Sequence, residues 1–182
     1  MKNEFAARSL NVAAFAHAGE SHAGDERLAR FERLMEETRG LGGETLLSYQ
    51  VQGELRQDAA GQDEPWLRLR AQATLPLICQ RCMGPVDVPV EFERDFRFVA
   101  SEELAAIEDE ESEEDVLVLA KAFNLLELVE DELLMAMPPV PKHDVCPKTV
   151  KLQAVDADFV EEPTGKPNPF AVLQQLKDKG LG

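Results

Sequence analysis

The feature that most constrains this chain is a strict two-residue alternation between Leu67 and Leu77. Apolar side chains occupy every second position, at Leu67, Leu69, Ala71, Ala73, Leu75 and Leu77. The positions between them are polar, at Arg68, Arg70, Gln72 and Thr74. Because successive side chains of a β-strand point to opposite faces, this pattern predicts a long strand with one buried and one solvated face.

Similar alternation on both sides of this segment predicts two more strands. Residues 48–56 place Tyr49, Val51 and Leu55 on one face, with Gly53 as the expected site of a twist or bulge. Residues 86–98 alternate in the same way, and only Arg94 breaks the apolar row. The three segments predict an antiparallel meander whose second turn is Cys79–Gly84. A further short strand is expected at 116–119.

Helical spacing predicts two helices that cover this sheet. Residues 25–39 carry an apolar stripe after Asp25, a candidate N-cap, and residues 124–137 begin at Asn124 and end before Pro138. The expected fold class is therefore α+β, with a twisted antiparallel sheet of long meander strands, two or more covering helices and a CxxC motif at a strand–strand turn.

The pattern predicts one domain with appendages. Hydrophobic residues make up 44% of the 182, which is enough for a core. We expect an extended N-terminal segment at 1–24, a single α+β domain at 25–160 and a C-terminal tail at 161–182. In the tail, Asn168 and Pro169 can start a short amphipathic helix.

A formal net charge of −16 disfavours unassisted binding to nucleic acid and favours basic protein partners. Residues 101–115 include nine acidic residues and no basic one. This acidic tract is expected to be a solvated loop, and the alternative is that it attracts a basic partner.

Nothing in the sequence indicates a membrane protein. No run of about 18 uncharged apolar residues occurs, and residues 10–18 are too interrupted for a secretion signal. Three cysteines form an odd set that suits reduced thiols or a metal better than a disulfide framework. The expected compartment is the cytoplasm.

Cysteine and histidine spacing indicates a candidate structural zinc site. Zinc takes four tetrahedral ligands, and Cys79, Cys82, His143 and Cys146 could supply them. The alternative is that the cysteines are ordinary reduced thiols in a turn and a core. A redox motif is less suited to a turn between antiparallel strands.

The sequence contains no motif of a known catalytic class, so neither an enzymatic activity nor a small-molecule substrate is expected. One alternative binding surface is the polar side of the central strand. Arg68 and Arg70, with Arg81 from the turn, could bind structured RNA through phosphate pairing and stacking. Arginines on the solvated face of a strand also need no function.

Several blocks in fixed order resemble the YceD family of large ribosomal RNA subunit accumulation proteins. They are the Cys79–Cys82 turn, the 129–141 block in which a helix ends in prolines, His143 with Cys146, and the Lys166–Leu173 ending. The resemblance implies a non-enzymatic role in the synthesis, processing or stability of 23S ribosomal RNA. Expected partners are ribosome-assembly proteins or a basic ribosomal protein, with ribosomal RNA contacted directly or indirectly. Direct binding of structured ribosomal RNA is the alternative, and a metal-dependent RNA-processing hydrolase is a weaker one.

Overall fold

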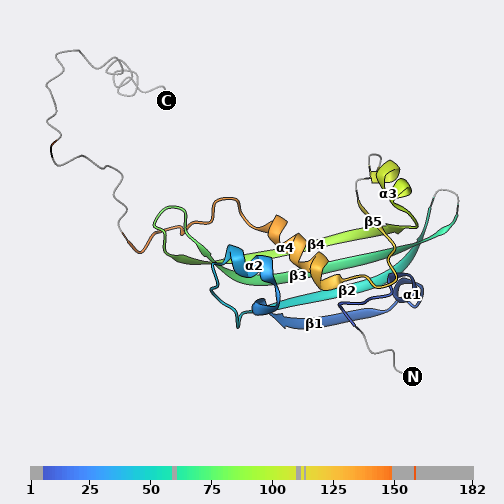
Figure 1. The fold of residues 1–182 in the computed structure, drawn as a ribbon, viewed down its shortest axis with the longest axis horizontal. Coiled ribbons are helices and arrows are strands. Elements are labelled where there is room, and N and C mark those ends of the chain that lie inside the picture. Colours follow the sequence, from blue (N-terminus) through green and yellow to red (C-terminus); the bar gives the residue numbers. More distant parts are fainter. Residues whose placement is uncertain (1–5, 59–60, 110–111, 113, 149–157, 159–182) are drawn as a thin grey trace, which may run out of the picture. The chain divides into compact units, whose positions relative to one another are not determined.

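A five-stranded sheet forms the centre of the protein (Figure 1). The computed structural model describes residues 6–58, 61–109, 112, 114–148 and 158, and the chain divides into two compact units, 1–149 and 150–182. The strands follow one another in space as they do in sequence: β1 (Ser21–Arg27), β2 (Leu46–Gln57), β3 (Asp63–Ile78), β4 (Pro85–Val99) and β5 (Asp115–Val118). The pairs β1–β2, β2–β3 and β3–β4 are antiparallel, whereas β5 runs parallel to β4. The long antiparallel meander is therefore confirmed.

One face of the sheet carries the core. Leu67, Leu69 and Leu75 are completely buried, while Arg68, Arg70 and Gln72 between them are exposed. Three of the helices pack on the buried face (Figure 1), namely α1 (Val12–His17), α2 (Glu32–Glu37) and α4 (Leu125–Ala136). This arrangement confirms the α+β class and the helical cover. The alternation of apolar and polar residues along β3 therefore identifies the side chains that face the helices.

The N-terminal part of the chain differs from the expected extended segment at 1–24 and helix at 25–39. Residues 12–17 form α1, and Asp25 lies within β1, where its carboxylate accepts a hydrogen bond from the Ser48 hydroxyl at 2.6 Å. A short 3-10 helix, η1 (Leu28–Arg30), and α2 follow in place of one long helix. Long-range pairing with β2 determines β1, and local periodicity cannot reveal such pairing.

The apolar stripe that suggested the long helix is still used. Leu28, Phe31 and Leu34 are all buried, although they come from two short helical pieces. Phe31 between them has an extended backbone, with φ −114° and ψ 98°. The spacing therefore identified the buried residues correctly but not the backbone that carries them.

Gly53 permits a close approach between α1 and the sheet. A Cβ atom at this position would lie 2.6 Å from Cδ1 of Phe15 and 2.9 Å from the backbone of Ala16. The glycine was expected to mark a twist or bulge, but the register between β2 and β3 continues through it without a bulge, with Gly53 opposite Leu67. Its lack of a side chain creates the space into which α1 packs.

Part of the acidic tract is helical where a loop was expected. Residues Glu102–Asp109 form α3, and the Ser101 hydroxyl accepts a hydrogen bond from the Leu104 N–H at 3.3 Å. Ser101 thus caps the first turn, and Glu102 and Glu103 in that turn interact favourably with the positive end of the helix dipole. Asp115, at the end of the tract, already belongs to β5. The parallel pairing of β4 and β5 requires a crossover between them, and α3 lies in it.

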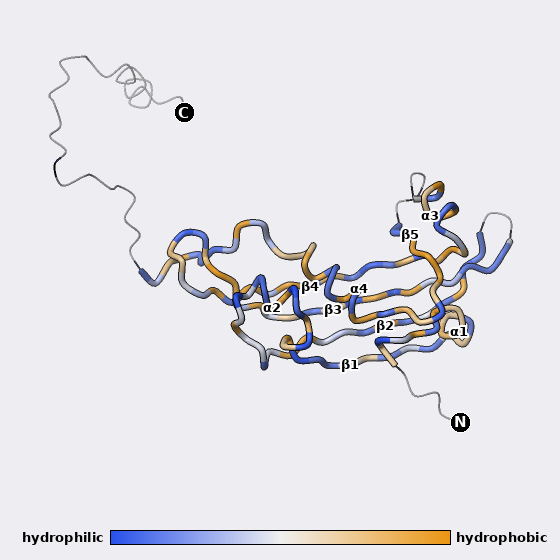
Figure 2. Tube along the Cα trace, in the orientation of Figure 1, coloured by the Kyte–Doolittle hydropathy of each residue, from blue (hydrophilic) through white to orange (hydrophobic). Residues whose placement is uncertain are grey.

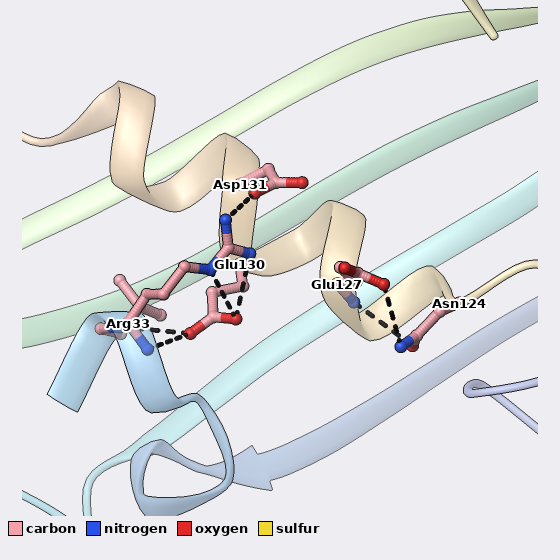
Figure 3. A network of polar contacts seen from close by, with 6 residues as sticks. Arg33, Asn124, Glu127, Glu130 and Asp131 are labelled. Atoms are coloured by element: carbon pink, nitrogen blue, oxygen red, sulfur yellow. Dashed lines mark hydrogen bonds and ion pairs between the residues drawn. The ribbon is translucent and has the colours of Figure 1, made fainter. Parts of the chain in front are cut away.

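The helix expected at 124–137 is confirmed as α4. The Asn124 side chain accepts a hydrogen bond from the Glu127 N–H at 3.4 Å, as a capping residue does (Figure 3). Met137 after it has an extended backbone and precedes two prolines, which ends the helix. The strand expected at 116–119 is also present, as β5.

Arg94 breaks the apolar row of β4 because it has an acidic partner on a helix. Its Nε lies 3.2 Å from Oε2 of Glu132, a residue of α4 with only 4% of its surface exposed. A second carboxylate, that of Asp115, lies 3.1 Å from Nη1 of Arg94. The guanidinium of Arg94 on β4 therefore forms ion pairs with residues of both α4 and β5.

Within the described residues, no helix has the length and apolar character needed to cross a bilayer. The tail helix expected from Asn168 and Pro169 lies outside the described residues, as does the domain boundary expected at 160/161. That boundary, and the one at 24/25, stay predictions.

Candidate metal centre

The first half of the candidate site is the turn between β3 and β4. The Cys79 N–H donates to the Gly84 carbonyl and the Met83 N–H donates to the Cys79 carbonyl, both at 2.9 Å. Met83 has a positive φ of 59°, which is uncommon for a residue with a side chain. These contacts close a tight turn that brings Cys79 and Cys82 to the same side.

The second half comes from the segment after α4. Beyond Pro138 and Pro139 the chain returns to the end of β3, where the Gln80 N–H donates to the Pro141 carbonyl at 2.9 Å. That hydrogen bond brings His143 and Cys146 beside the turn. Sequence reasoning missed Gln80 and Pro141 as the residues that join the two halves; the run of prolines after the helix was the available sign of an extended segment.

The four predicted ligand residues meet at one point. One ligand atom from each of Cys79, Cys82, His143 and Cys146 lies within 4.8 Å of all the others. The sulfur atoms of Cys79 and Cys146 are 3.9 Å apart, and Sγ of Cys82 lies 3.5 Å from Nδ1 of His143. Tetrahedral zinc separates two sulfur ligands by about 3.8 Å and a sulfur from a nitrogen by about 3.6 Å. The arrangement therefore has the dimensions of a site that can bind a metal ion.

The surroundings of the thiols also suit a cation. Desolvation raises the pKa of Cys79, but hydrogen bonds from the backbone of Cys82, His143 and Arg81 outweigh it and lower this pKa to about 5. Desolvation and the two neighbouring thiols raise the pKa of Cys146. The thiolate of Cys79 is thus stabilised, whereas ionisation of the neighbouring Cys146 thiol is disfavoured. A bound cation would favour the ionised form of both thiols.

The donor set favours a structural centre over a catalytic one. Structural zinc is held by four protein ligands, whereas catalytic zinc keeps one position for water or substrate. Here three sulfurs and one nitrogen could supply all four ligands. Cys79 is completely buried and the other three ligands are half-buried, so the centre lies partly under the surface.

The three arginines of the alternative RNA surface do not gather in one place. Arg68 forms an ion pair with Asp95, with Nε 3.0 Å from Oδ1, and Arg70 stands exposed opposite Glu93. Arg81 lies in the turn beyond Ile78, about 26 Å or more along the strand from Arg70. Both strand arginines therefore have carboxylates as their neighbours.

Comparison with known proteins supports the resemblance found in the sequence. Residues 67–177 match the family model described as "Large ribosomal RNA subunit accumulation protein YceD". A protein of that name from Haemophilus influenzae is 36% identical over 112 residues, which is 60% of this chain and 64% of the relative. The match thus covers less than two thirds of that relative's length. No solved structure matches the chain. The matched range contains all four residues of the candidate metal centre. The chain belongs to the YceD family.

Proposed function

We propose that this protein is a non-enzymatic accessory factor of ribosome biogenesis, needed for the accumulation of 23S ribosomal RNA. The observation that carries the proposal is the family match over residues 67–177. The net charge of −16 supports action through basic ribosomal or assembly proteins, because a surface of this charge repels RNA at long range. A role in ribosome assembly supports a cytoplasmic location.

Depletion of the protein in cells tests the role. Large-subunit ribosomal RNA should fall relative to small-subunit ribosomal RNA, and expression of the full chain should restore the ratio. An unchanged ratio after depletion would contradict the role itself.

A pull-down of large-subunit precursors from lysate tests the mode of action. Nuclease treatment should leave at least one large-subunit protein bound if contacts with proteins dominate. If nuclease treatment releases every large-subunit component, the result would favour direct RNA binding through Arg68, Arg70 and Arg81. Against that alternative, Arg68 is neutralised by Asp95 and Arg70 faces Glu93.

The candidate centre has a structural role in this proposal. Cys79, Cys82, His143 and Cys146 hold one zinc ion, which ties the segment after α4 to the β3–β4 turn. A hydrolytic centre at these four residues would need an open coordination position, and a site with four protein ligands offers none.

Metal analysis of the untagged protein tests the centre. We expect one zinc per chain, lost in Cys82→Ser and His143→Ala but kept in His17→Ala, whose exposed histidine is a matched control. A metal-free wild-type protein whose stability does not respond to added zinc would rule the site out.

A further inference from the structure

The acidic helix α3 is set apart from the other helices. It lies beside β5 and β4 at the end of the sheet, while α1, α2 and α4 cover the core (Figure 1). Two features anchor the helix on the side that faces the sheet. Ala105 is buried, and Nη1 of Arg97 on β4 forms an ion pair with Oε2 of Glu108 at 2.7 Å. The helix is thus anchored on one side, which leaves its other side free.

The free side of α3 exposes two large apolar side chains. Leu104 is 43% exposed and Ile107 is 64% exposed. Residues three apart lie on the same face of a helix, so the two form one apolar spot. The tube coloured by hydropathy shows hydrophobic and hydrophilic positions side by side in this helix (Figure 2).

Within the described part of the chain, two carboxylates beside this spot, those of Glu102 and Glu103, are not paired with arginine or lysine as Glu108 is. Glu102 and Glu103 are exposed, and neither has an ion-pair partner among the described residues. Hydrogen bonds to the backbone N–H of Glu103 and to Ser101 lower the pKa of Glu103, so it stays charged at neutral pH. No lysine or arginine occurs between 101 and 115.

We infer that α3 is a docking site for a basic, amphipathic segment of another protein. Apolar side chains of that segment would cover Leu104 and Ile107, while flanking lysines or arginines would meet Glu102 and Glu103. Nucleic acid and an anionic membrane fit poorly, since both carry the same charge as the rim. The inference rests on the proposed function, and it adds the surface at which a basic large-subunit protein is bound.

Photo-crosslinking of the full-length protein in cells tests this site. A photoreactive amino acid replaces Ile107 in one variant and Leu46 in the control, since Leu46 is similarly exposed at 58% but lies on β2. We expect the Ile107 variant to form an adduct with an identified basic protein of the large subunit, absent from the control. Adducts with RNA alone, the same adducts in both variants, or none at Ile107 would overturn the inference.

A double substitution, Leu104→Ser with Ile107→Ser, measures the strength of the contact. Both side chains are exposed, so folding should be unchanged by circular dichroism. Affinity for the crosslinked protein, purified, should fall roughly tenfold or more, as when anchor residues are truncated. Leu46→Ser with Met135→Ser is the matched control and should bind normally, because both side chains lie outside α3.

Failure of this inference can be told from failure of the role. If the α3 double variant restores large-subunit RNA in depleted cells and binds like wild type, the docking site is wrong but the role stands. If depletion leaves ribosomal RNA unchanged, the role is wrong whatever α3 does.

Discussion

At the scale of single residues, Glu130 shows how one buried side chain can replace a local helix cap. Phe31, the N-cap of α2, offers no side-chain hydrogen bond. Instead Oε1 of Glu130 accepts from the N–H groups of Arg33 at 2.8 Å and Leu34 at 3.2 Å (Figure 3). The Arg33 guanidinium then pairs with Oε2 of the same carboxylate at 3.1 Å. A residue of α4 thus satisfies the free donors and positive end of α2.

We therefore expect Glu130→Ala to destabilise the protein by roughly 2–3 kcal/mol, because it leaves donors of α2 without a partner. Asp131 also pairs with Arg33, but its side chain is 44% exposed. Asp131→Asn should cost under about 1 kcal/mol, as exposed ion pairs usually do. Urea denaturation of both variants measures the difference. Equal losses of stability in the two variants would show that the hydrogen bonds from α2 to Glu130 add no stability.

Glu132 gives a prediction on pH. Burial raises the pKa of its carboxyl, opposed by Arg94 and assisted by Asp115 and Asp131. An acid with a raised pKa binds more protons in the folded state, so its contribution favours folding at low pH. That contribution is lost as pH rises from the unfolded pKa through the higher folded pKa.

The Glu132→Gln variant should therefore gain stability relative to wild type as pH rises from about 4 to 7. Urea denaturation of both proteins across this range measures the difference. Glu127→Gln, at an exposed position of the same helix, serves as the control. If the difference in unfolding free energy between wild type and Glu132→Gln stays constant with pH, the pKa of Glu132 is not raised in the folded protein.

At the scale of elements, the contact between α1 and β2 depends on a missing side chain. Gly53 faces Phe15 and the backbone of Ala16 within 2.9 Å of where a Cβ would lie. Since backbone atoms cannot move aside as a side-chain tip can, Gly53→Ala must displace the whole helix.

We expect Gly53→Ala to cost roughly 1–3 kcal/mol, the usual range for overpacking in a core. Gly43→Ala is the matched control, because its added Cβ would meet Ala29 and Met35 at ordinary contact distances of 3.5 and 3.7 Å. Thermal unfolding of the two variants checks the contrast. If both melt at the same temperature, the close packing of α1 is not limiting.

At the scale of the whole first unit, the candidate metal centre links segments that are distant in sequence. Its ligands come from the turn after β3 and from the segment after α4, and the hydrogen bond between Gln80 and Pro141 lies beside them. A zinc ion would therefore stabilise the return of the chain after α4 more than the sheet itself.

Chelation should then act locally. Hydrogen exchange of the Gln80 amide should accelerate when zinc is removed, because its acceptor on Pro141 is released. The Leu69 amide in the centre of β3 should keep its protection. Uniform acceleration at both amides would indicate global unfolding, and no change at Gln80 would contradict the tether.

The elements whose side-chain pattern repeats over many residues could be predicted from the amino-acid sequence alone. Alternation identified β2, β3 and β4 and their buried faces, and helical spacing with the Asn124 cap identified α4. Ligand chemistry selected the four residues that meet at the candidate metal centre. Each of these patterns is local, or depends only on the residue types that zinc accepts.

Tertiary structure alone decided the elements whose stability comes from distant partners. Ser21–Arg27 becomes β1 because β2 lies beside it, α2 receives its cap from Glu130, and Arg94 is accepted on the core face because Glu132 meets it. The helix in the acidic tract likewise depends on Arg97 of β4 and on the crossover to β5. Pairing, capping and charge compensation across the fold leave no periodic trace along the chain, so only the assembled structure reveals them.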